Sequence, residues 1–341
     1  WNPMSLFVLR FIQGVGLGAE VPIANTYVNE IARAEVRGRF YLLFQMVFGI
    51  GIVTASVLGY FLVPTIGWQS MFYIGALPAL LAFVMRFMLP ESPRWLVQKG
   101  RYAEADRIIT GIEESITRSG KTLPPPNPAA VPAATAQRTR WFEMFQGIYL
   151  KRTLSDWAFW FCCFSTSYGL STWLPTLYRT VFHLSVVDSL KYGMITSSGG
   201  IIAALCCAFF IDYVGRRAWF TGAFILGGIT LLLVWPVGTD TAEKVLIFVT
   251  VGNFFISSLA LAINLYTSEI YPTRIRAFAG AVGGAWQRVA AILGTNVVAW
   301  LRPFGTGSVF LYFGGLAIRC VVLAFLFAVE TKGKRQEEVA P

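Results

Sequence analysis

Charged residues are scarce in this 341-residue chain, and histidine is nearly absent. Lys, Arg, Asp and Glu together make up 13% of the sequence, and His183 is its one histidine. We find no pair of carboxylates suited to general acid–base catalysis, and a single histidine cannot supply a catalytic or metal-binding set. We therefore expect a protein that is not an enzyme and that uses no cofactor and no metal ion.

Cysteine is also rare, and its positions exclude two common roles. The five cysteines all fall inside long apolar stretches, at Cys162, Cys163, Cys206, Cys207 and Cys320. An external disulfide framework or a zinc-binding loop would instead place cysteines in polar connecting segments. These five are therefore expected to be packing residues.

Long apolar runs are what the sequence has in abundance. Hydrophobic residues make up 55% of the chain and aromatic residues 15%, more than an ordinary soluble protein carries. A helix needs about 20 apolar residues to cross the hydrocarbon core of a bilayer. Stretches of this kind lie at 5–28, 40–63, 70–89, 154–178, 192–211, 218–237, 245–266, 277–301 and 307–329.

The pattern inside these nine stretches indicates helices. Apolar residues run continuously rather than alternating, which argues against the strands of a membrane barrel. A large soluble protein could also contain buried helices of this length, but nine in succession favour a bilayer. The sequence therefore predicts an all-α membrane protein.

The positions of the basic residues predict its orientation. The formal net charge is +10, and most of the 28 Lys and Arg residues gather in every second connection. Those rich segments are 29–39, 90–153, 216–217, 274–276 and 332–335. Cytoplasmic loops carry such an excess, so the C-terminus is expected to be cytoplasmic. The basic charge is then a topology signal, and no nucleic-acid partner is expected.

Two charged phrases recur at a fixed distance. "NEIARAEVRG" begins at Asn29 and "SEIYPTRIRA" at Ser268, so Glu30 and Glu269 are 239 residues apart. Glu91 and Glu330, which close the third and the ninth stretch, show the same separation of 239. One offset shared by two junctions indicates a duplication of six-helix halves.

This repeat predicts the domain organisation. Residues 1–89 would be the second half of an N-terminal six-helix domain, with three further helices expected before residue 1. Residues 90–152 would be a cytoplasmic hinge loop with a surface helix and a Pro-rich linker. Residues 153–329 would form the C-terminal six-helix domain, and 330–341 a cytoplasmic tail.

Four motifs resemble those of the major facilitator superfamily of transporters. They are "RFIQGVGLG" from Arg10, "PESPRWL" from Pro90, "DYVGRR" from Asp212 and "ETKGK" from Glu330. The resemblance implies a twelve-helix fold, of which nine helices are present here, and a protein of the plasma (inner) membrane. It also implies alternating access to a central site. We expect the protein to be a monomer.

Other segments look more like one branch of that superfamily. "GAEVP" from Gly18 and "WLP" from Trp173 are similar to the niacin and organic-acid transporters. The seventh helix of the inferred full protein lacks the Gln-Leu-Ser type of motif that sugar porters carry there. This departure favours an organic acid over a sugar as the substrate.

Glu20 is the first candidate for a mechanism, because a carboxylate inside an apolar helix is costly and usually functional. Arg10 and Gln13 fall on the same side of that helix as Glu20. We expect Glu20 with Arg10 to carry proton coupling and Gln13 to contact substrate. A structural ion pair is the alternative interpretation.

A second group of residues is expected to bind substrate. Arg288, next to Gln287, lies within the stretch 277–301 and needs a counter-charge, which a substrate carboxylate could supply. The resemblance makes the fourth, seventh and tenth helices line the cavity. Their polar stripes would add Ser165, Tyr168, Thr172, Asn253, Ser257 and Asn264. Pairing with an acid of another helix, or hydrogen bonds between helices, is the alternative.

The charged junctions are expected to form a cytoplasmic gate. Ion pairs at these positions can exist in one state and break when the two halves rock. The gate residues are Glu30, Arg37, Glu91, Arg94, Asp212, Arg216, Arg217, Glu269, Arg276 and Glu330. A topology signal alone would not need the acidic members.

The sequence thus predicts a secondary transporter that moves a small organic or aromatic acid together with a proton through the bilayer. A sugar or polyol porter is the alternative substrate class. A membrane sensor or binding protein on the same fold, without transport, is the alternative of another kind.

Overall fold

A computed structural model describes residues 2–31, 37–118, 120, 141–238 and 240–332. These residues form helices and their connections, with no strand among them. Nine of the described helices have 18 residues or more. They are α1 (Pro3–Ile31), α2 (Arg37–Ile66), α3 (Gln69–Met88), α6 (Gly147–Val181), α7 (Val186–Val214), α8 (Arg216–Leu233), α9 (Ala242–Ile270), α10 (Thr273–Leu301) and α11 (Thr306–Phe327).

Each predicted apolar stretch corresponds to one of these helices, which confirms the all-α membrane class. By length and composition alone, five described segments could cross a membrane, in α2, α7, α8 with the turn after it, α9 and α11. Shorter apolar segments lie in α1 and α3. The long helices α6 and α10 contain more polar residues, so they are the helices to search for a site.

The chain divides into two compact units, which are described separately. The first comprises residues 1–48 and 72–134, and the second comprises 49–71 and 135–341. The domain bounds expected from the repeat stay a prediction.

The first unit contains α1, the first part of α2, most of α3 and two shorter helices, α4 (Pro93–Gln98) and α5 (Tyr102–Arg118). The Ser92 hydroxyl caps α4 by accepting from the Trp95 N–H at 3.3 Å, which satisfies one free donor of the first turn. The Tyr27 hydroxyl donates to the Pro90 carbonyl at 3.1 Å. The helix α5 lies within the predicted hinge segment 90–152.

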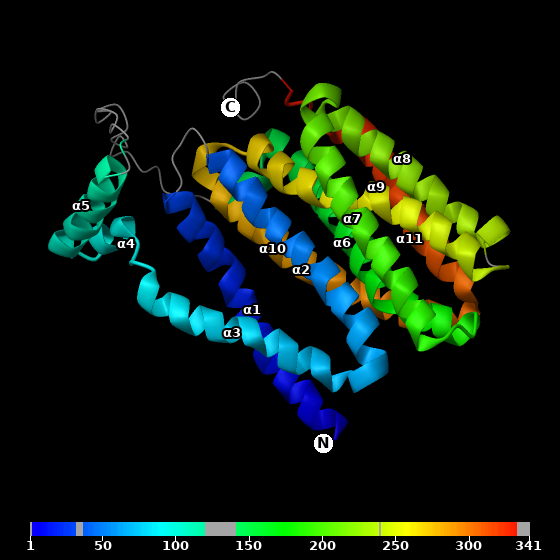
Figure 1. Ribbon diagram of the computed structural model, residues 1–341. Coiled ribbons are helices and arrows are strands. Elements are labelled where there is room, and N and C mark those ends of the chain that lie inside the picture. Colours follow the sequence, from blue (N-terminus) through cyan, green and yellow to red (C-terminus); the bar gives the residue numbers. More distant parts are fainter. Residues whose placement is uncertain (1, 32–36, 119, 121–140, 239, 333–341) are drawn as a thin grey trace. The chain divides into compact units, whose positions relative to one another are not determined.

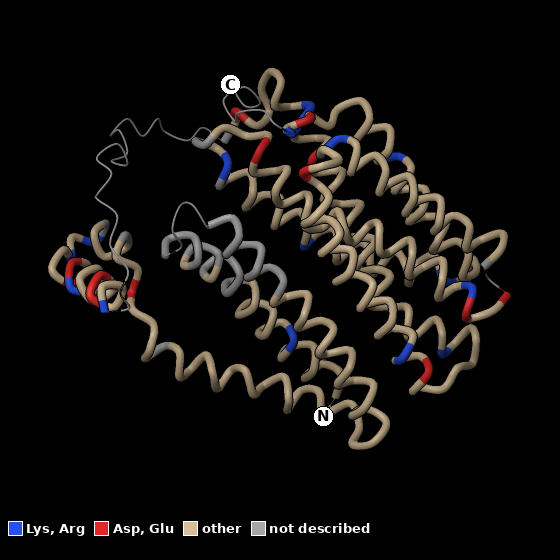
Figure 2. The backbone as a smooth tube through the Cα atoms, turned by 45° about the horizontal axis from the view of Figure 1, so that its top comes forward, with Lys and Arg blue, Asp and Glu red and all other residues tan. Residues whose placement is uncertain are grey.

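In the second unit, helices α6 to α11 pack side by side as one bundle (Figure 1). Its charged residues lie mainly near the ends of the helices, and the middle of the bundle is almost free of charge (Figure 2). Three short helical turns complete the unit: η2 (Trp141–Phe145), η3 (Val234–Gly238) and η4 (Arg302–Phe304).

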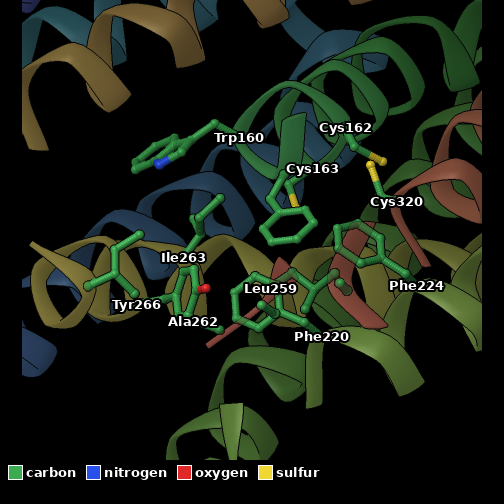
Figure 3. Close-up of a cluster of buried hydrophobic side chains, with 14 of the residues drawn as sticks. Trp160, Cys162, Cys163, Phe220, Phe224, Leu259, Ala262, Ile263, Tyr266 and Cys320 are labelled. Atoms are coloured by element: carbon green, nitrogen blue, oxygen red, sulfur yellow. The ribbon is translucent and has the colours of Figure 1, made fainter. Parts of the chain in front are cut away.

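The core of this unit is built from aromatic, aliphatic and small side chains (Figure 3). Phe159 of α6 lies 5.4 Å from Phe220 and 5.5 Å from Phe224 of α8, measured between ring centroids. Tyr266 of α9 lies 5.2 Å from Phe220 in the same way. Burying several aromatic rings in contact stabilises the helix packing by more than their area alone.

Close contact between α6 and α10 depends on a glycine. A Cβ added at Gly294 would lie 2.3 Å from the carbonyl oxygen of Ser165 and 2.7 Å from its Cα. Only glycine lets two helix backbones approach so closely, a common device where helices pack within a membrane. This contact fixes the position of α6 against α10.

Candidate functional site

Four parts of the second unit meet in a charged cluster, formed by Asp212, Arg216, Glu269, Glu330 and Thr331. The buried Arg216 guanidinium donates to both carboxylate oxygens of Glu269, at 3.1 and 2.8 Å, and to Asp212 Oδ1 at 2.7 Å. The Thr331 hydroxyl donates to Glu269 Oε2 at 2.5 Å. A bidentate, largely buried guanidinium–carboxylate pair is strong and directional. The cluster therefore holds α7, α8, α9 and the chain after α11 together.

Glu330 completes the cluster by capping α8. Its two oxygens accept from the backbone N–H groups of Arg216 at 2.9 Å and Arg217 at 3.1 Å. Burial by itself raises the pKa of Glu330. These donors and the Lys332 N–H outweigh that effect, so the pKa of the carboxyl lies below its ordinary value. The positive end of the α8 dipole acts in the same direction.

The Glu330 cap requires a glycine. Gly215 adopts φ +94, and a Cβ added there would lie 2.6 Å from Glu330 Oε2. Backbone with this φ is open to glycine and strained for other residues. The sequence Asp212–Arg217 therefore combines a charge pair with the one residue type that lets the carboxylate approach.

Five of the predicted gate residues come together here, although not all through their side chains. The Arg217 guanidinium leaves the cluster and contacts the Phe325 carbonyl and ring instead. Arg276 is half-buried on α10, and Glu91 is exposed in the first unit. The side chains of Glu30, Arg37 and Arg94 lie outside the described residues. A gating role for the whole set stays a prediction.

The predicted polar stripe of α6 divides into three environments. Ser165 is fully buried and faces Gly294 of α10. Tyr168 is half-buried, and its ring centroid lies 6.4 Å from that of Phe164. Thr172 is exposed. Of the three, Tyr168 and Thr172 are the ones that a solute could reach without separating α6 from α10.

The predicted polar stripe of α9 lies partly against α7. The Thr250 and Thr196 hydroxyls are 3.0 Å apart, and Ser257 lies beside Gly200. Asn253 is buried, and its Oδ1 has no hydrogen-bond partner among the described residues. Asn264 donates to the carbonyl of Ala260 at 2.9 Å in its own helix. A buried amide oxygen without a partner can accept a hydrogen bond from a bound hydroxyl or N–H. Asn253 is therefore the group of this stripe that we would test first for contact with a solute.

The α1 residues show part of the expected arrangement. The Arg10 guanidinium donates to Gln13 Oε1 at 3.0 Å and lies 4.8 Å above the Phe72 ring. Arg10 and Gln13 therefore share one face, as predicted. The Glu20 side chain lies outside the described residues.

An aromatic stripe runs along α6 and is completed by α10. We define it as Trp157, Trp160, Phe161, Phe164 and Tyr168 of α6 with Trp286 of α10. Trp286 stacks on Trp157, with ring centroids 5.5 Å apart, and its Nε1–H donates to the Trp157 carbonyl at 2.8 Å. Trp160 stacks on Phe164 at 5.2 Å. The stripe continues to Tyr168, which carries its one hydroxyl. Trp160 and Phe164 are buried, and the other four members are half-buried.

Arg288 follows Trp286 on α10 after one residue, the half-buried Gln287. The Arg288 side chain is exposed, and no hydrogen bond or ion pair joins it to any residue in the described ranges. A cation within a membrane-spanning helix needs a partner. The expectation that Arg288 is open to an external anion is thus consistent with the structure, and its role stays a prediction.

Sequence reasoning missed one group of residues. Asp156 of α6 is 1% exposed, and its Oδ1 lies 2.9 Å from the hydroxyl of Thr267 on α9. Trp160 donates to the same hydroxyl at 3.1 Å. The rule that singles out Glu20 applies equally to Asp156. In the sequence, Asp156 resembles a charged residue at the end of a membrane helix, because it lies only two residues inside the predicted stretch 154–178.

Comparison with known proteins identifies the family. The family profile "Sugar (and other) transporter" matches residues 1–341. The chain is 31% identical over 341 residues to the niacin transporter NiaP of Acinetobacter baylyi, an alignment that covers 99% of this chain and 76% of that protein. It is 28% identical over 312 residues to the 4-hydroxybenzoate transporter PcaK of Pseudomonas aeruginosa, covering 89% of this chain and 67% of that protein.

Solved structures agree on the fold. A crystal structure of a D-xylose–proton symporter matches with a TM-score of 0.65 and 21% identity, covering 96% of this chain and 72% of that one. An inward-open structure of the xylose transporter XylE from E. coli matches with a TM-score of 0.62 and 20% identity, covering 97% and 71%. The chain therefore belongs to the sugar (and other) transporter family of the major facilitator superfamily, as a multi-pass membrane transporter of small molecules.

Proposed function

We propose that the protein is a secondary transporter that moves a small aromatic acid together with a proton. It would act as a monomer in the plasma (inner) membrane, with its C-terminus in the cytoplasm. The observation that carries this proposal is the exposed cation Arg288 on α10, to which no described residue is joined by a hydrogen bond or an ion pair. The aromatic stripe lies in the same bundle, and Trp286 joins it from a different face of α10, because residues two apart on a helix point to different sides.

The stripe suits a flat aromatic solute. Trp286, Trp157 and Phe161 present ring faces and edges to one another at centroid distances of 5.5 and 6.3 Å. A further aromatic ring can join such a set in a stacked or edge-on arrangement, worth about 0.5–1.5 kcal/mol beyond burial. An aliphatic or heavily hydroxylated solute gains less from this surface.

Arg288 suits an anion. A carboxylate can accept two parallel hydrogen bonds from a guanidinium, which fixes both its position and its orientation. An aromatic carboxylate would satisfy a cation in the membrane-spanning helix while its ring rests on apolar side chains. Gln287, Tyr168 and Thr172 of the same unit would supply further polar contacts.

The names of two similar proteins support the same substrate class. One is a niacin transporter and the other a 4-hydroxybenzoate transporter, and both names denote small aromatic acids. The identities of 31% and 28% support the class and leave the individual compound to experiment.

The proton would be carried by Glu20 with Arg10, because an intramembrane carboxylate can load on one side and unload on the other. The charged cluster would set the balance between two conformations. In one of them Arg216, Glu269 and Glu330 are joined as described above, and a movement of helices within the C-terminal half, coupled to its rocking, would separate them. A few kcal/mol of ion pairing is enough to bias such an equilibrium.

A sugar or polyol is the second candidate, favoured by the polar stripe of α9. Asn253, Ser257 and Asn264 offer amide and hydroxyl groups of the kind that bind sugar hydroxyls. The buried Asn253 Oδ1 in particular lacks a described partner.

Flux measurements in proteoliposomes separate the candidates. Labelled nicotinate, 4-hydroxybenzoate, xylose and glucose are offered with and without an inward proton gradient. We expect the gradient to drive accumulation of the two acids and a protonophore to abolish it. Accumulation of a sugar with no acid uptake would overturn the proposal.

Two controls make that result specific. Protein-free liposomes measure diffusion of the neutral acids through the bilayer. Arg288→Gln should raise the KM for the acids strongly, and Arg288→Lys should raise it less, because lysine keeps the charge and loses the bidentate geometry. Equal uptake by wild type and Arg288→Gln would remove Arg288 from the site.

A further inference from the structure

Asp156 is the one carboxylate in the second unit's described residues that is almost completely buried, at 1% exposed. It lies in the cytoplasmic part of α6 as the topology predicts it, within the helix bundle. A carboxylate removed from water must be paired with a cation, held by several donors, or kept neutral by a proton. The contacts of Asp156 indicate which of these applies.

The hydrogen bonds of Thr267 bear on whether Asp156 carries a proton. Its Oγ1 lies 2.9 Å from Asp156 Oδ1, 2.8 Å from the Ile263 carbonyl and 3.1 Å from Trp160 Nε1. Trp160 can only donate and the Ile263 carbonyl can only accept, whereas a hydroxyl donates one proton and accepts up to two bonds. The hydroxyl therefore cannot donate to both Ile263 and an ionised Asp156.

A protonated Asp156 resolves this conflict. Its carboxyl O–H donates to Thr267 Oγ1, the Thr267 hydroxyl donates to Ile263, and Trp160 Nε1–H donates to Thr267. All three short contacts are then hydrogen bonds. With an ionised carboxylate, the Thr267 hydroxyl gives up its bond to the Ile263 carbonyl, which keeps its helical hydrogen bond. The buried charge would then have the Thr267 hydroxyl and the Trp160 indole as donors and no cation among the described residues, which is unfavourable.

The other titratable groups around Asp156 are occupied elsewhere or are neutral. Arg152, one turn earlier on α6, donates to the Ile270 carbonyl at 3.2 Å and lies over the Tyr149 ring. The Tyr271 hydroxyl lies 2.8 Å from that of Thr153, and the Tyr266 hydroxyl accepts from the Val329 N–H at 2.9 Å. Cys163 is a buried thiol on α6. On α10, the buried residues of this core cluster are the apolar Ile275, Ala279 and Ala290.

Asp156 also connects the two functional parts of the unit. On α9, Thr267 precedes Glu269 of the charged cluster by two residues. On α6, Trp160 belongs to the aromatic stripe and packs against Gly283 of α10, where an added Cβ would lie 2.9 Å from its ring. Opening the end of the α6–α9 contact would therefore expose Asp156 to water at the same time as it strains the Arg216–Glu269 pair.

We propose that Asp156 is a proton-binding site of the transport cycle, additional to Glu20. It holds a proton while α6 and α9 are closed around it. When their cytoplasmic ends separate, water enters, the carboxyl O–H bond breaks and water takes up the proton. This inference rests on the proposed proton symport for its role in coupling, but not for the protonation of the closed state.

Infrared spectroscopy of the reconstituted protein tests the closed state directly. Protonated carboxyl groups give a carbonyl stretch that ionised carboxylates lack. We expect one such band at neutral pH that disappears in Asp156→Asn and is retained in Asp240→Asn, which changes an exposed acid paired with Lys244. A wild-type spectrum without an Asp156-dependent band would overturn the proposal.

Transport assays test the coupling. In Asp156→Asn the amide keeps the size of the side chain and can donate to Thr267, so substrate exchange across the membrane should stay within about twofold of wild type. Gradient-driven accumulation should fall by roughly tenfold or more. Thr267→Val should weaken accumulation, and Thr267→Ser should restore it.

The outcomes distinguish the two proposals. Full gradient-driven accumulation in Asp156→Asn overturns the role of Asp156 and leaves proton symport standing. Wild-type transport that ignores the gradient overturns proton symport, and with it the coupling role, whereas the infrared band still reports whether Asp156 binds a proton.

Discussion

Asp156 and Glu269 are two carboxylates in neighbouring helices of one bundle, and they are held in opposite ways. Glu269 accepts two hydrogen bonds from the Arg216 guanidinium and a third from Thr331. Asp156 has the Thr267 hydroxyl and the Trp160 indole as donors and no cation among the described residues. In a medium of low polarity, the number of donors decides whether a carboxylate keeps its charge. The same carboxyl group can therefore hold an ion pair at one site and a movable proton at the other.

The largest effect on stability is expected when the Arg216 guanidinium is removed. Arg216→Gln leaves Glu269 and Asp212 facing each other's charge without the guanidinium, and breaking a largely buried pair is costly. Because both acids keep some exposure to water, we expect a loss of about 2–3 kcal/mol. Thermal unfolding in detergent measures the loss.

Arg217→Gln is the matched comparison for that variant. The Arg217 guanidinium contacts Phe325 and no carboxylate among the described residues, so its removal should cost less than half as much. Equal destabilisation by both variants would show that the ion pairs of the charged cluster contribute no more to stability than the contacts of Arg217.

Two glycine-to-alanine variants test the capping of the α8 N-terminus by Glu330. Gly215→Ala combines a strained φ of +94 with a Cβ 2.6 Å from Glu330 Oε2, and should destabilise the protein by about 1–3 kcal/mol. Gly222→Ala lies in the interior of α8, where an added Cβ meets nothing within 4 Å. That change should be neutral or slightly stabilising, since alanine favours a helix. The reverse order of the two melting temperatures would contradict the geometry.

Much of the fold could be predicted from the sequence, because long apolar runs are a direct consequence of a bilayer. The stretch 154–178 locates α6, although the helix itself extends from Gly147 to Val181. A count of apolar residues misses the end turns, where polar side chains meet water while the backbone stays helical. The family resemblance was confirmed over the whole chain.

The partners inside the site were harder to predict. The repeated phrase places Glu269 and Arg276 seven residues apart, yet the cation that grips Glu269 is Arg216 of another helix. Which arginine reaches a given acid depends on how α8 and α9 pack, and local sequence does not encode that. Asp156 was missed for a related reason, because its burial comes from α9 and not from its own neighbours in sequence.

The pH dependence of stability sharpens the contrast between the two carboxylate types. The pKa of Glu330 is lower in the folded protein than its ordinary value, so its contribution is fully present above that ordinary value. The contribution is lost as the pH falls through the lowered pKa. We therefore expect the stability difference between wild type and Glu330→Gln to be constant near neutral pH and to vanish in acid. A difference that grows in acid would contradict the assignment.

The smallest effect is expected for a change in the aromatic stripe, and it is an effect on the KM for the substrate. Trp286→Phe keeps an aromatic ring on α10 but removes the stacking area on Trp157 and the hydrogen bond to its carbonyl. The loss of one such contact is worth about 1 kcal/mol, or roughly a fivefold higher KM for an aromatic acid. An aliphatic acid of similar size has no ring to stack, so its KM should hardly change in the same variant. If both acids were affected equally, Trp286 would support the packing of α6 against α10 and not the recognition of an aromatic ring.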